Sequence, residues 1–194
     1  VEQVTVSQVG PDRRPVPGTE MVFDCDTVLL SVGLIPENEL TRQAGIGMDR
    51  RTNGAVVYEN METRVPGIFA CGNVVHVHDL VDYVSAESER AGAAAAAYVK
   101  GIQAEGPVLE LAAGDGVSYT VPQHLRVEAL AKAAEVFFRV NRVTHAAEIL
   151  ATDAAGKTIA RFKREHMAPG EMERVALPPQ LLKQAQGPLT LRIR

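Results

Sequence analysis

Two short apolar runs, each closed by a glycine, most constrain what the first half of this chain can fold into. The first is Cys25–Gly33, where an acidic residue precedes a continuous apolar stretch, and the second is Ile68–Gly72. Continuous apolar runs bounded by turn residues are typical of strands buried on both faces, as in a parallel sheet. We therefore predict an α/β region whose ligand lies beyond the carboxyl ends of its strands.

The other elements expected in the first half alternate short strands with helices. Strands are expected at 1–9, 21–23 and 54–58, because apolar and polar residues alternate there or apolar runs are brief. A short helix is expected at 37–44, closed by Gly45. A longer one is expected from residue 84 to about residue 100, capped by Asp82 or Ser85.

Gly72 and Asn73 are the clearest ligand-binding candidates. They follow the apolar run at 68–71 and precede the longer helix. Glycine lets a phosphate approach the backbone closely, and an asparagine side chain can hydrogen-bond a ribityl or ribose hydroxyl. The free N–H groups at the start of the helix suit a phosphate or an electron-rich ring carbonyl.

The pattern changes near residues 101–107, which contain two glycines and a proline. Residues 1–105 carry a net charge of −7 and residues 106–194 a net charge of +3. We therefore expect two domains, 1–105 and 106–194, joined by a linker.

The second domain reads as a small β-sandwich of immunoglobulin-like architecture. Seven short apolar segments are separated by turn residues, and 179–186 can form a helical turn. The candidate strands are 108–112, 117–121, 135–140, 147–152, 157–162, 173–177 and 189–193. No Cys–Trp–Cys signature accompanies them, since the chain has no tryptophan. Packing, dimerisation or docking of a partner subunit is the expected task of this domain.

Composition narrows the classes of protein further. With 46% hydrophobic residues and a net charge of −4, the chain is expected to be globular, and neither half is basic enough for nucleic acid. No apolar run is long enough to cross a membrane. Two cysteines cannot build a disulfide scaffold, so a reducing, cytoplasmic compartment is expected. The chain opens at Val1 inside an expected strand, and we expect it to be the C-terminal part of a longer protein.

Three segments in order resemble the FAD-dependent pyridine nucleotide-disulfide oxidoreductase family. Asp26–Asn38 resembles the stretch returning from the NAD(P) domain to the FAD domain, and Thr63–Asn73 resembles the second FAD motif. Asp82–Ala97 resembles the helix that follows that motif. The loop His76–Asp82 looks most like the subgroup that works beside glycerol-3-phosphate-dehydrogenase-type flavoproteins.

The resemblance implies FAD and NAD(P)H as cofactors and a partial Rossmann-like fold. Gly72 and Asn73 would contact the ribityl chain and pyrophosphate, with Asn in place of the commoner Asp. The backbone of Asp82, Tyr83 and Val84 would approach the flavin ring, and Gly33 with Pro36 would shape the inter-domain turn near the cofactor. The resemblance thus implies a flavin half-site of six residues: Gly33, Gly72, Asn73, Asp82, Tyr83 and Val84.

The chain departs from the family pattern in what it lacks. Both GxGxxG motifs and any Cys-x-x-Cys pair are absent from the sequence. We therefore expect a C-terminal fragment of an FAD-dependent, NAD(P)H-linked oxidoreductase, inactive alone, that supplies the second half of the flavin site. Its expected partners are the missing N-terminal segment, another flavoprotein subunit and copies of itself in a homo-oligomer. The alternative is a non-catalytic fragment or subunit whose β domain serves assembly.

Several side chains carry two interpretations. His76 and His78 are either hydrogen-bonded histidines of a flavin-adjacent loop, metal ligands with Asp79 or Asp82, or a proton donor near the flavin. No wider ligand cluster supports a metal, so we expect none. Tyr83 either stacks on the flavin or packs as an ordinary half-buried tyrosine. Cys25 and Cys71 are expected to be inert packing residues, and Glu171 and Glu173 to be solvated. No catalytic residue stands out.

Overall fold

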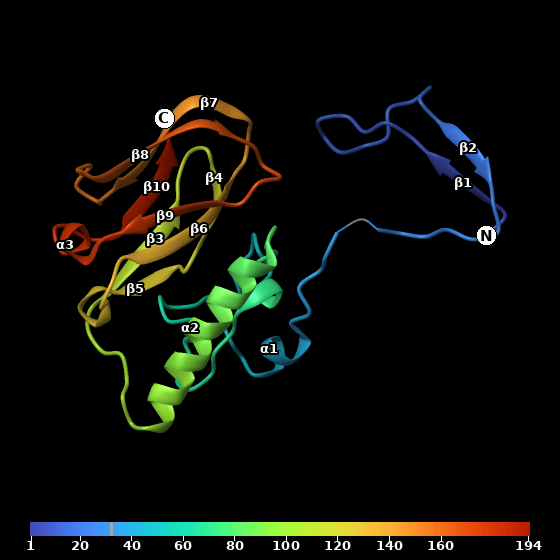
Figure 1. The fold of residues 1–194 in the computed structure, drawn as a ribbon. Helices are drawn as coiled ribbons and strands as arrows, with labels where there is room; N and C mark the ends of the chain where they lie inside the picture. Colours follow the sequence, from blue (N-terminus) through green and yellow to red (C-terminus); the bar gives the residue numbers. More distant parts are fainter. Residues whose placement is uncertain (32) are drawn as a thin grey trace. The chain divides into compact units, whose positions relative to one another are not determined.

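The chain divides into two compact units in the computed structural model, residues 1–34 and residues 35–194. The structure describes residues 1–31 and 33–194. The first unit contains an antiparallel hairpin of β1 (Gln3–Val6) and β2 (Met21–Asp24), shown in blue in Figure 1. Both strands were predicted, and β1 is shorter than the alternating segment 1–9 because only four of its residues pair with β2.

The prediction of a buried strand at 25–33 is wrong for the residues that the structure describes. Residue 32 is not among the described residues. Residues 27–31 form no regular secondary structure, and Leu29 and Leu30 are 92% and 78% exposed. A strand needs hydrogen-bonding neighbours on both sides to be buried in a parallel sheet. The described residues provide no such neighbour here, so the apolar run remains extended and uncovered.

The second unit begins with helix α1 (Glu39–Gln43), which Gly45 closes in the left-handed region at φ +71°. The long helix α2 (Val81–Val99) begins three residues earlier than predicted. Its N-cap is Leu80, and no side chain caps it, so Asp82 and Ser85 do not have the predicted capping role. Asp82 lies within the first turn instead of before it.

Between the two helices the chain folds with very little regular structure. The strands predicted at 54–58 and 68–71 are present only as isolated bridges, such as Val57 with Thr63 and Glu62 with Phe69. Single bridges cannot propagate into a ladder, because each neighbouring segment turns away after one pair. A 3₁₀ turn, η1 (Gly72–Val74), follows. The segment packs around a small apolar core: Ile46, Ala55, Val57, Met61, Val75, Ala91 and Val121.

Residues 108–193 form two sheets, and all seven predicted strands are confirmed. The order in the larger sheet is β5–β3–β10–β7–β8, with β10 parallel to β3, and in the smaller sheet it is β4–β6–β9. The bounds are β3 (Val108–Ala113), β4 (Val117–Val121), β5 (His124–Arg126), β6 (Ala134–Val140), β7 (Thr144–Thr152), β8 (Thr158–Met167), β9 (Glu173–Leu177) and β10 (Leu189–Ile193). Strand β5, with only three residues, and the 3₁₀ turn η2 (Val127–Ala129) were missed, and the predicted helical turn is α3 (Pro179–Leu182).

Both sheets contribute side chains to one apolar core. Phe138 and Leu177 enter it from the smaller sheet, and Ile149 and Leu191 enter it from the larger one. All four side chains are fully buried. The described chain is therefore mostly β, with few helices. Residues on both sides of the expected boundary at 105/106 belong to the same compact unit, and the division into two domains there stays a prediction. Among the described residues, no helix combines the length and apolar character needed to cross a bilayer.

Candidate functional site

The predicted ligand-binding turn Gly72–Asn73 lies against the start of helix α2. Gly72 has φ +72°, a left-handed conformation that favours glycine. A Cβ atom at this position would lie 3.2 Å from Cγ1 of Val84, in the first turn of the helix. The structure thus places the turn at Gly72 against Val84 in the first turn of α2, and the ligand-binding role of Gly72, Asn73 and the 82–84 segment stays a prediction.

The underside of the turn is fixed by two close approaches from the preceding chain. The buried side chain of Asn38 donates from Nδ2 to the carbonyl oxygens of Val74, at 2.7 Å, and Asn53, at 3.0 Å. Gly54 passes so close to Val75 that a Cβ atom would overlap the Val75 carbonyl group. The position of the turn is therefore set by one buried side-chain amide and one close backbone contact.

A buried carboxylate holds the turn from the side of the helix. Oε2 of Glu87, on α2, accepts a hydrogen bond from the Gly72 N–H at 2.6 Å. The same carboxylate lies 2.9 Å from Nε2 of His76 and 3.2 Å from Nε2 of His78. The side chains of all three residues are about 1% exposed. One carboxylate thus gathers the glycine turn and both histidines.

The charges of this network follow from its burial and its hydrogen bonds. Burial alone would raise the pKa of Glu87, but hydrogen bonds from His76, His78 and Gly72 outweigh it and lower the pKa to about 2. Burial lowers the pKa of His76, against the opposing effect of the Glu87 hydrogen bond. The network therefore joins an anionic Glu87 to a neutral His76, whose Nε2–H donates to the Glu87 carboxylate. The Nδ1 atom of His76 has no hydrogen-bond partner among the described residues.

The two histidines were predicted to hydrogen-bond, to bind a metal or to serve as a proton donor near the flavin. Both hydrogen-bond Glu87 in the structure, and the metal and proton-donor roles stay predictions. Glu87 is also the third possible ligand: its carboxylate and a nitrogen of each histidine lie within 4.8 Å of one another. Asp79 and Asp82, the third ligands considered from the sequence, are not part of this group. A ligating histidine normally donates its other ring N–H to a partner, and neither Nδ1 atom has a partner among the described residues, which favours the hydrogen-bonded network.

Asn73 presents its amide differently from what the sequence suggests. Its Oδ1 accepts a hydrogen bond from the His78 N–H at 3.1 Å, so the acceptor serves the loop. The Nδ2 group has no such bond among the described residues. Asn73 is half-buried, and it can therefore offer a donor to a ligand while its oxygen fixes the loop.

The first turn of α2 is open at its N-terminal end. Val81 is 75% exposed, Asp82 is exposed, and no side chain caps the helix. Free backbone N–H groups and the positive end of the helix dipole attract electron-rich atoms. Tyr83 points to the sheets instead: its ring lies 5.3 Å from that of Phe137 and 5.6 Å below the Arg174 guanidinium. This is the packing expected of an ordinary half-buried tyrosine.

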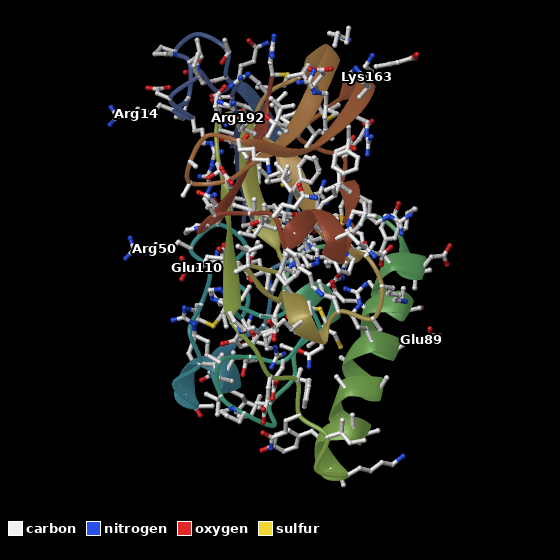
Figure 2. All side chains as sticks on the ribbon, turned by 90° about the vertical axis from the view of Figure 1, so that its left-hand side faces the viewer. Arg14, Arg50, Glu89, Glu110, Lys163 and Arg192 are labelled. Atoms are coloured by element: carbon white, nitrogen blue, oxygen red, sulfur yellow. The ribbon has the colours of Figure 1, made fainter. Side chains whose placement is uncertain are left out.

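Glu87 is the site residue that the sequence reasoning missed. By its position in the sequence, Glu87, like Glu89, is an acidic residue suited to the positive end of the helix. The two differ completely, since Glu87 is buried and Glu89 points outward from α2 (Figure 2). The spacing of Val84, Glu87, Ala91 and Ala95 follows one helical face, and this periodicity would have placed Glu87 on the buried side.

The other predicted residues lie apart from this cluster. Gly33 belongs to the first unit, where it has φ +111° and no atom near its Cβ position; its role in the flavin half-site stays a prediction. Cys25 and Cys71 are both free, and the Cys71 thiol lies 3.6 Å from the Ser88 hydroxyl.

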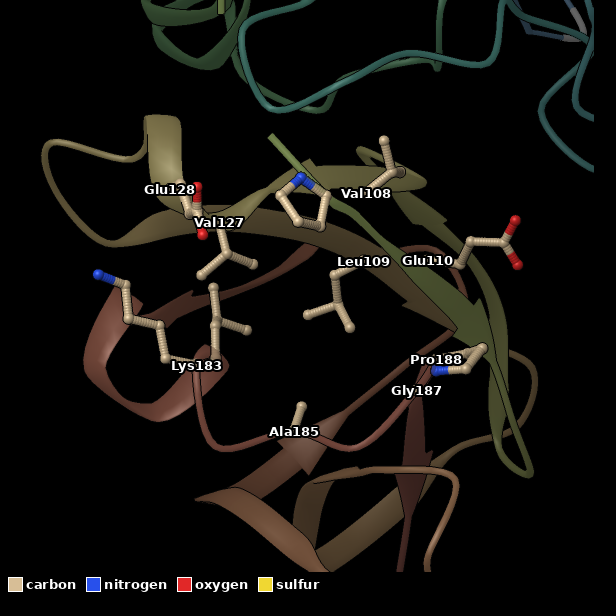
Figure 3. A pocket seen from close by; sticks show the side chains of 11 residues that line it. Val108, Leu109, Glu110, Val127, Glu128, Lys183, Ala185, Gly187 and Pro188 are labelled. Carbon is tan, nitrogen blue, oxygen red and sulfur yellow. The ribbon is translucent and has the colours of Figure 1, made fainter. Parts of the chain in front are cut away.

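A cavity of about 460 Å³ lies in the β region, between β3, η2 and α3. Figure 3 shows Leu109, Val127 and Lys183 among its lining side chains. None of the residues predicted for the flavin site lines this cavity. The flavin-site candidates and this cavity are therefore separate features of the molecule.

Known proteins resemble part of the chain. A family model described as pyridine nucleotide-disulphide oxidoreductase matches residues 2–101. Apoptosis-inducing factor 3 of Mus musculus is 37% identical over 70 residues, which are 36% of this chain and 11% of that protein. The mitochondrial dihydrolipoyl dehydrogenase of Caenorhabditis elegans is 39% identical over 59 residues, 30% of this chain and 12% of that protein.

A third relative has a longer matching stretch. The ferredoxin reductase component of chlorobenzene dioxygenase from Cupriavidus sp. (strain PS12) is 33% identical over 81 residues, 38% of this chain and 19% of that protein. The matched stretches thus span between 11% and 19% of the length of these relatives. No solved structure matches the chain.

Proposed function

The chain belongs to the pyridine nucleotide-disulphide oxidoreductase family, and from this premise we propose that it supplies the second half of a flavin site. FAD and NAD(P)H are the cofactors of this family of flavin oxidoreductases. The observation that carries the proposal is the meeting of the Gly72–Asn73 turn with the uncapped start of α2. The turn offers the Nδ2 group of Asn73 as a hydrogen-bond donor, and the start of α2 offers backbone N–H groups.

The residues present fit a flavin in three respects. Gly72 has no side chain to block a ribityl chain or pyrophosphate, and Asn73 offers Nδ2 as a donor to a hydroxyl oxygen. The N–H groups at the start of α2, in the segment Asp82–Val84, suit a ring carbonyl oxygen. Tyr83 would share its N–H there, since this group also donates to the carbonyl oxygen of Leu80 at 3.2 Å, and its ring packs on Phe137. When bound, the flavin supplies the transfer of a hydride from NAD(P)H, and the protein supplies position and electrostatics.

The rest of the active site is proposed to come from outside residues 1–194. The sequence contains neither a GxGxxG motif nor a Cys-x-x-Cys pair, and it spans a small share of its relatives. A preceding FAD- and NAD(P)-binding segment, another flavoprotein subunit and further copies of the chain are the proposed partners. We propose that Gly33 and Pro36 shape the turn near the cofactor.

Three narrower features are part of the same proposal. The loop His76–Asp82 supports the subgroup that works beside glycerol-3-phosphate-dehydrogenase-type flavoproteins. The two sheets with a common core support an immunoglobulin-like sandwich, since every strand pair in them except β3–β10 is antiparallel and most sequence-adjacent strands lie in different sheets. Two free cysteines support a reducing, cytoplasmic setting.

The test is a titration of the purified chain with FAD, followed by visible absorption and by flavin fluorescence. Asn73→Ala removes the proposed donor and also the acceptor for the His78 N–H, whereas Asn73→Asp keeps that acceptor. We expect the alanine variant to bind FAD about tenfold more weakly, which corresponds to about 1.4 kcal/mol. The aspartate variant is expected to remain within about threefold of the original chain, because Asp can accept from a ribityl hydroxyl.

Asn141→Ala is the matched control, since Asn141 is exposed in a turn of the β region. Equal affinities for the chain with Asn73→Ala and with Asn141→Ala would contradict the role of Asn73. A chain that binds no FAD at any concentration would favour the alternative function. In that alternative, the fragment is non-catalytic and its β sheets serve assembly.

A further inference from the structure

We propose that the β region positions the flavin-facing residues by clamping the histidine loop, defined as residues 76–80, with Arg139 as the positioning residue. The inference rests on the proposed flavin site and adds a role for residues 102–194, which the family match does not cover. The histidine loop connects the Gly72–Asn73 turn to the first turn of α2. Whatever fixes this loop therefore fixes the spacing of both proposed flavin contacts.

Arg139, on β6, reaches the loop with several hydrogen bonds. Its Nη2 donates to the carboxylate of Asp79 and to the carbonyl oxygen of Val77, the latter at 3.1 Å. Its Nη1 donates to the carbonyl oxygen of Gly170, at 2.6 Å. The backbone N–H of Met172 donates to the second oxygen of Asp79, at 2.6 Å. The carboxylate of Asp79 is thus held from two separate segments of the β region.

Phe137 forms the apolar floor beneath the same loop. Its ring centroid lies 5.8 Å from that of His76, 5.7 Å from that of His78 and 5.3 Å from that of Tyr83. Phe137 is 2% exposed, so the loop and the start of α2 cover it almost completely. Aromatic packing of this kind fixes the height of the loop above the sheet, while Arg139 fixes its position along the strand.

The alternation of β6 explains why one strand can both build the core and hold the loop. Successive side chains of a strand point to opposite faces. Phe138 and Val140 enter the core between the sheets. Phe137 and Arg139 face the loop, and Glu135, two residues earlier, bonds Arg90 of α2 at 2.8 Å. Figure 1 shows the first turns of α2 near β6 and β9.

This arrangement gives the clamp a measurable consequence at the proposed flavin site. With Arg139 replaced, Asp79 loses its charged partner and Val77 loses the donor to its carbonyl oxygen, so the loop keeps the Met172 N–H bond, its packing on Phe137 and its attachment through Glu87. The Asn73 amide depends on the loop, because its Oδ1 accepts from the His78 N–H. Loosening the loop therefore misplaces both the Nδ2 donor of Asn73 and the first N–H groups of α2.

The test compares Arg139→Met, Arg139→Lys and the control Arg142→Met. Methionine keeps most of the apolar stem but removes every donor, and lysine restores a charge for Asp79 without the planar fork. Arg142 lies two residues beyond the end of β6 and pairs with Asp115, and its side chain is 51% exposed. Three quantities are measured: amide hydrogen exchange of the cofactor-free chain, FAD affinity and the midpoint potential of the bound flavin.

We expect Arg139→Met to speed exchange in residues 76–84 by about tenfold, the effect of losing roughly 1.4 kcal/mol of local stability. The FAD affinity is expected to fall by a similar factor and the flavin potential to shift. Arg139→Lys should restore part of each effect, and Arg142→Met should change none. A purely structural role would lower stability without moving the potential of the bound flavin.

The outcomes separate the two proposals. Unchanged exchange in residues 76–84 of Arg139→Met overturns the clamp, whether or not the chain binds FAD. Faster exchange with unaltered FAD affinity and potential overturns the positioning role. Faster exchange in a chain that binds no FAD in any form leaves the loop contact established, but overturns the proposed flavin site and with it the role of Arg139 toward the cofactor.

Discussion

Residues 35–101 and residues 107–194 belong to one compact unit but are held together by different means. The later region is built from eight strands in two sheets around an apolar core. The earlier region has two helices, isolated bridges and a small core, and its turns are fixed by buried polar groups: Asn38 beneath η1, and Glu87 beside it. Regular ladders satisfy backbone groups automatically, whereas irregular turns need side chains to do so.

The two regions are also joined by buried charged side chains. Arg126, at the end of β5, bonds Glu59 at 3.0 Å and Glu62 at 2.9 Å, and its guanidinium lies 4.3 Å from the centre of the Tyr58 ring. The three charged side chains are buried, and Tyr58 is half-buried. Irregular backbone can therefore be positioned as firmly as a sheet, but its stability depends on the charge of a few side chains. Four predictions probe this difference, beginning with the largest effect.

The apolar core of the β region should be the most sensitive to truncation. Phe138 is fully buried between the sheets, and Phe138→Ala is expected to lower the free energy of unfolding by about 4 kcal/mol through lost burial and the cavity left behind. Urea or thermal unfolding measures this loss. Val143→Ala, at an exposed position after β6, serves as the control and should change stability by less than about 0.5 kcal/mol. A similar loss in both variants would contradict the assigned core.

A methyl group added at Gly54, beneath the glycine turn, should cause the second largest loss in the free energy of unfolding. Gly54→Ala places a Cβ atom on the Val75 carbonyl group, so one of the two backbone segments must move. Overpacking of this kind costs about 3 kcal/mol. Gly47→Ala is the matched control, because no atom lies near its Cβ position. If the two variants unfold at the same urea concentration, the close approach of Gly54 to the 72–76 segment is wrong.

Acid should lower the stability of the earlier region through Glu87. At any single pH, this loss should be smaller than the losses caused by the two substitutions above. The lowered pKa of Glu87, about 2, means that its stabilising contribution is complete above the ordinary value near 4.5 and is lost as the pH falls toward 2. The lowered pKa of His76 acts in the same direction, because the unfolded chain takes up a proton first as the pH falls below about 6.5. Together they predict faster hydrogen exchange around η1 on acidification.

Glu87→Gln tests the source of that acid sensitivity. Glutamine cannot ionise and can accept with only one oxygen, so the variant should be less stable by about 2 kcal/mol at pH 7. Its stability should also depend less on pH between 4.5 and about 2.5. Glu89→Gln, on the exposed side of the same helix (Figure 2), should keep the original pH profile. A Glu87→Gln chain with the same acid profile as the original would show that other groups carry the effect.

The sequence by itself determined the elements whose patterns are local. Alternating apolar residues identified all seven strands longer than three residues in the β region, and glycines marked the end of α1 and the turn before α2. The order of the family motifs also predicted that the turn Gly72–Asn73 and the helix start contribute to one site, and this stays a prediction. Periodicity and turn chemistry depend on neighbouring residues only, so they are readable along the chain.

Only the tertiary structure decided which residues hold that site. The apolar run at 27–31 has the pattern of a buried strand, yet it is exposed because no described strand pairs with it. Glu87 meets its histidine partners, and Arg139 meets Asp79, across 9 to 60 residues of chain. Burial and hydrogen bonding between distant segments depend on which surfaces meet in space, and no local pattern carries that information.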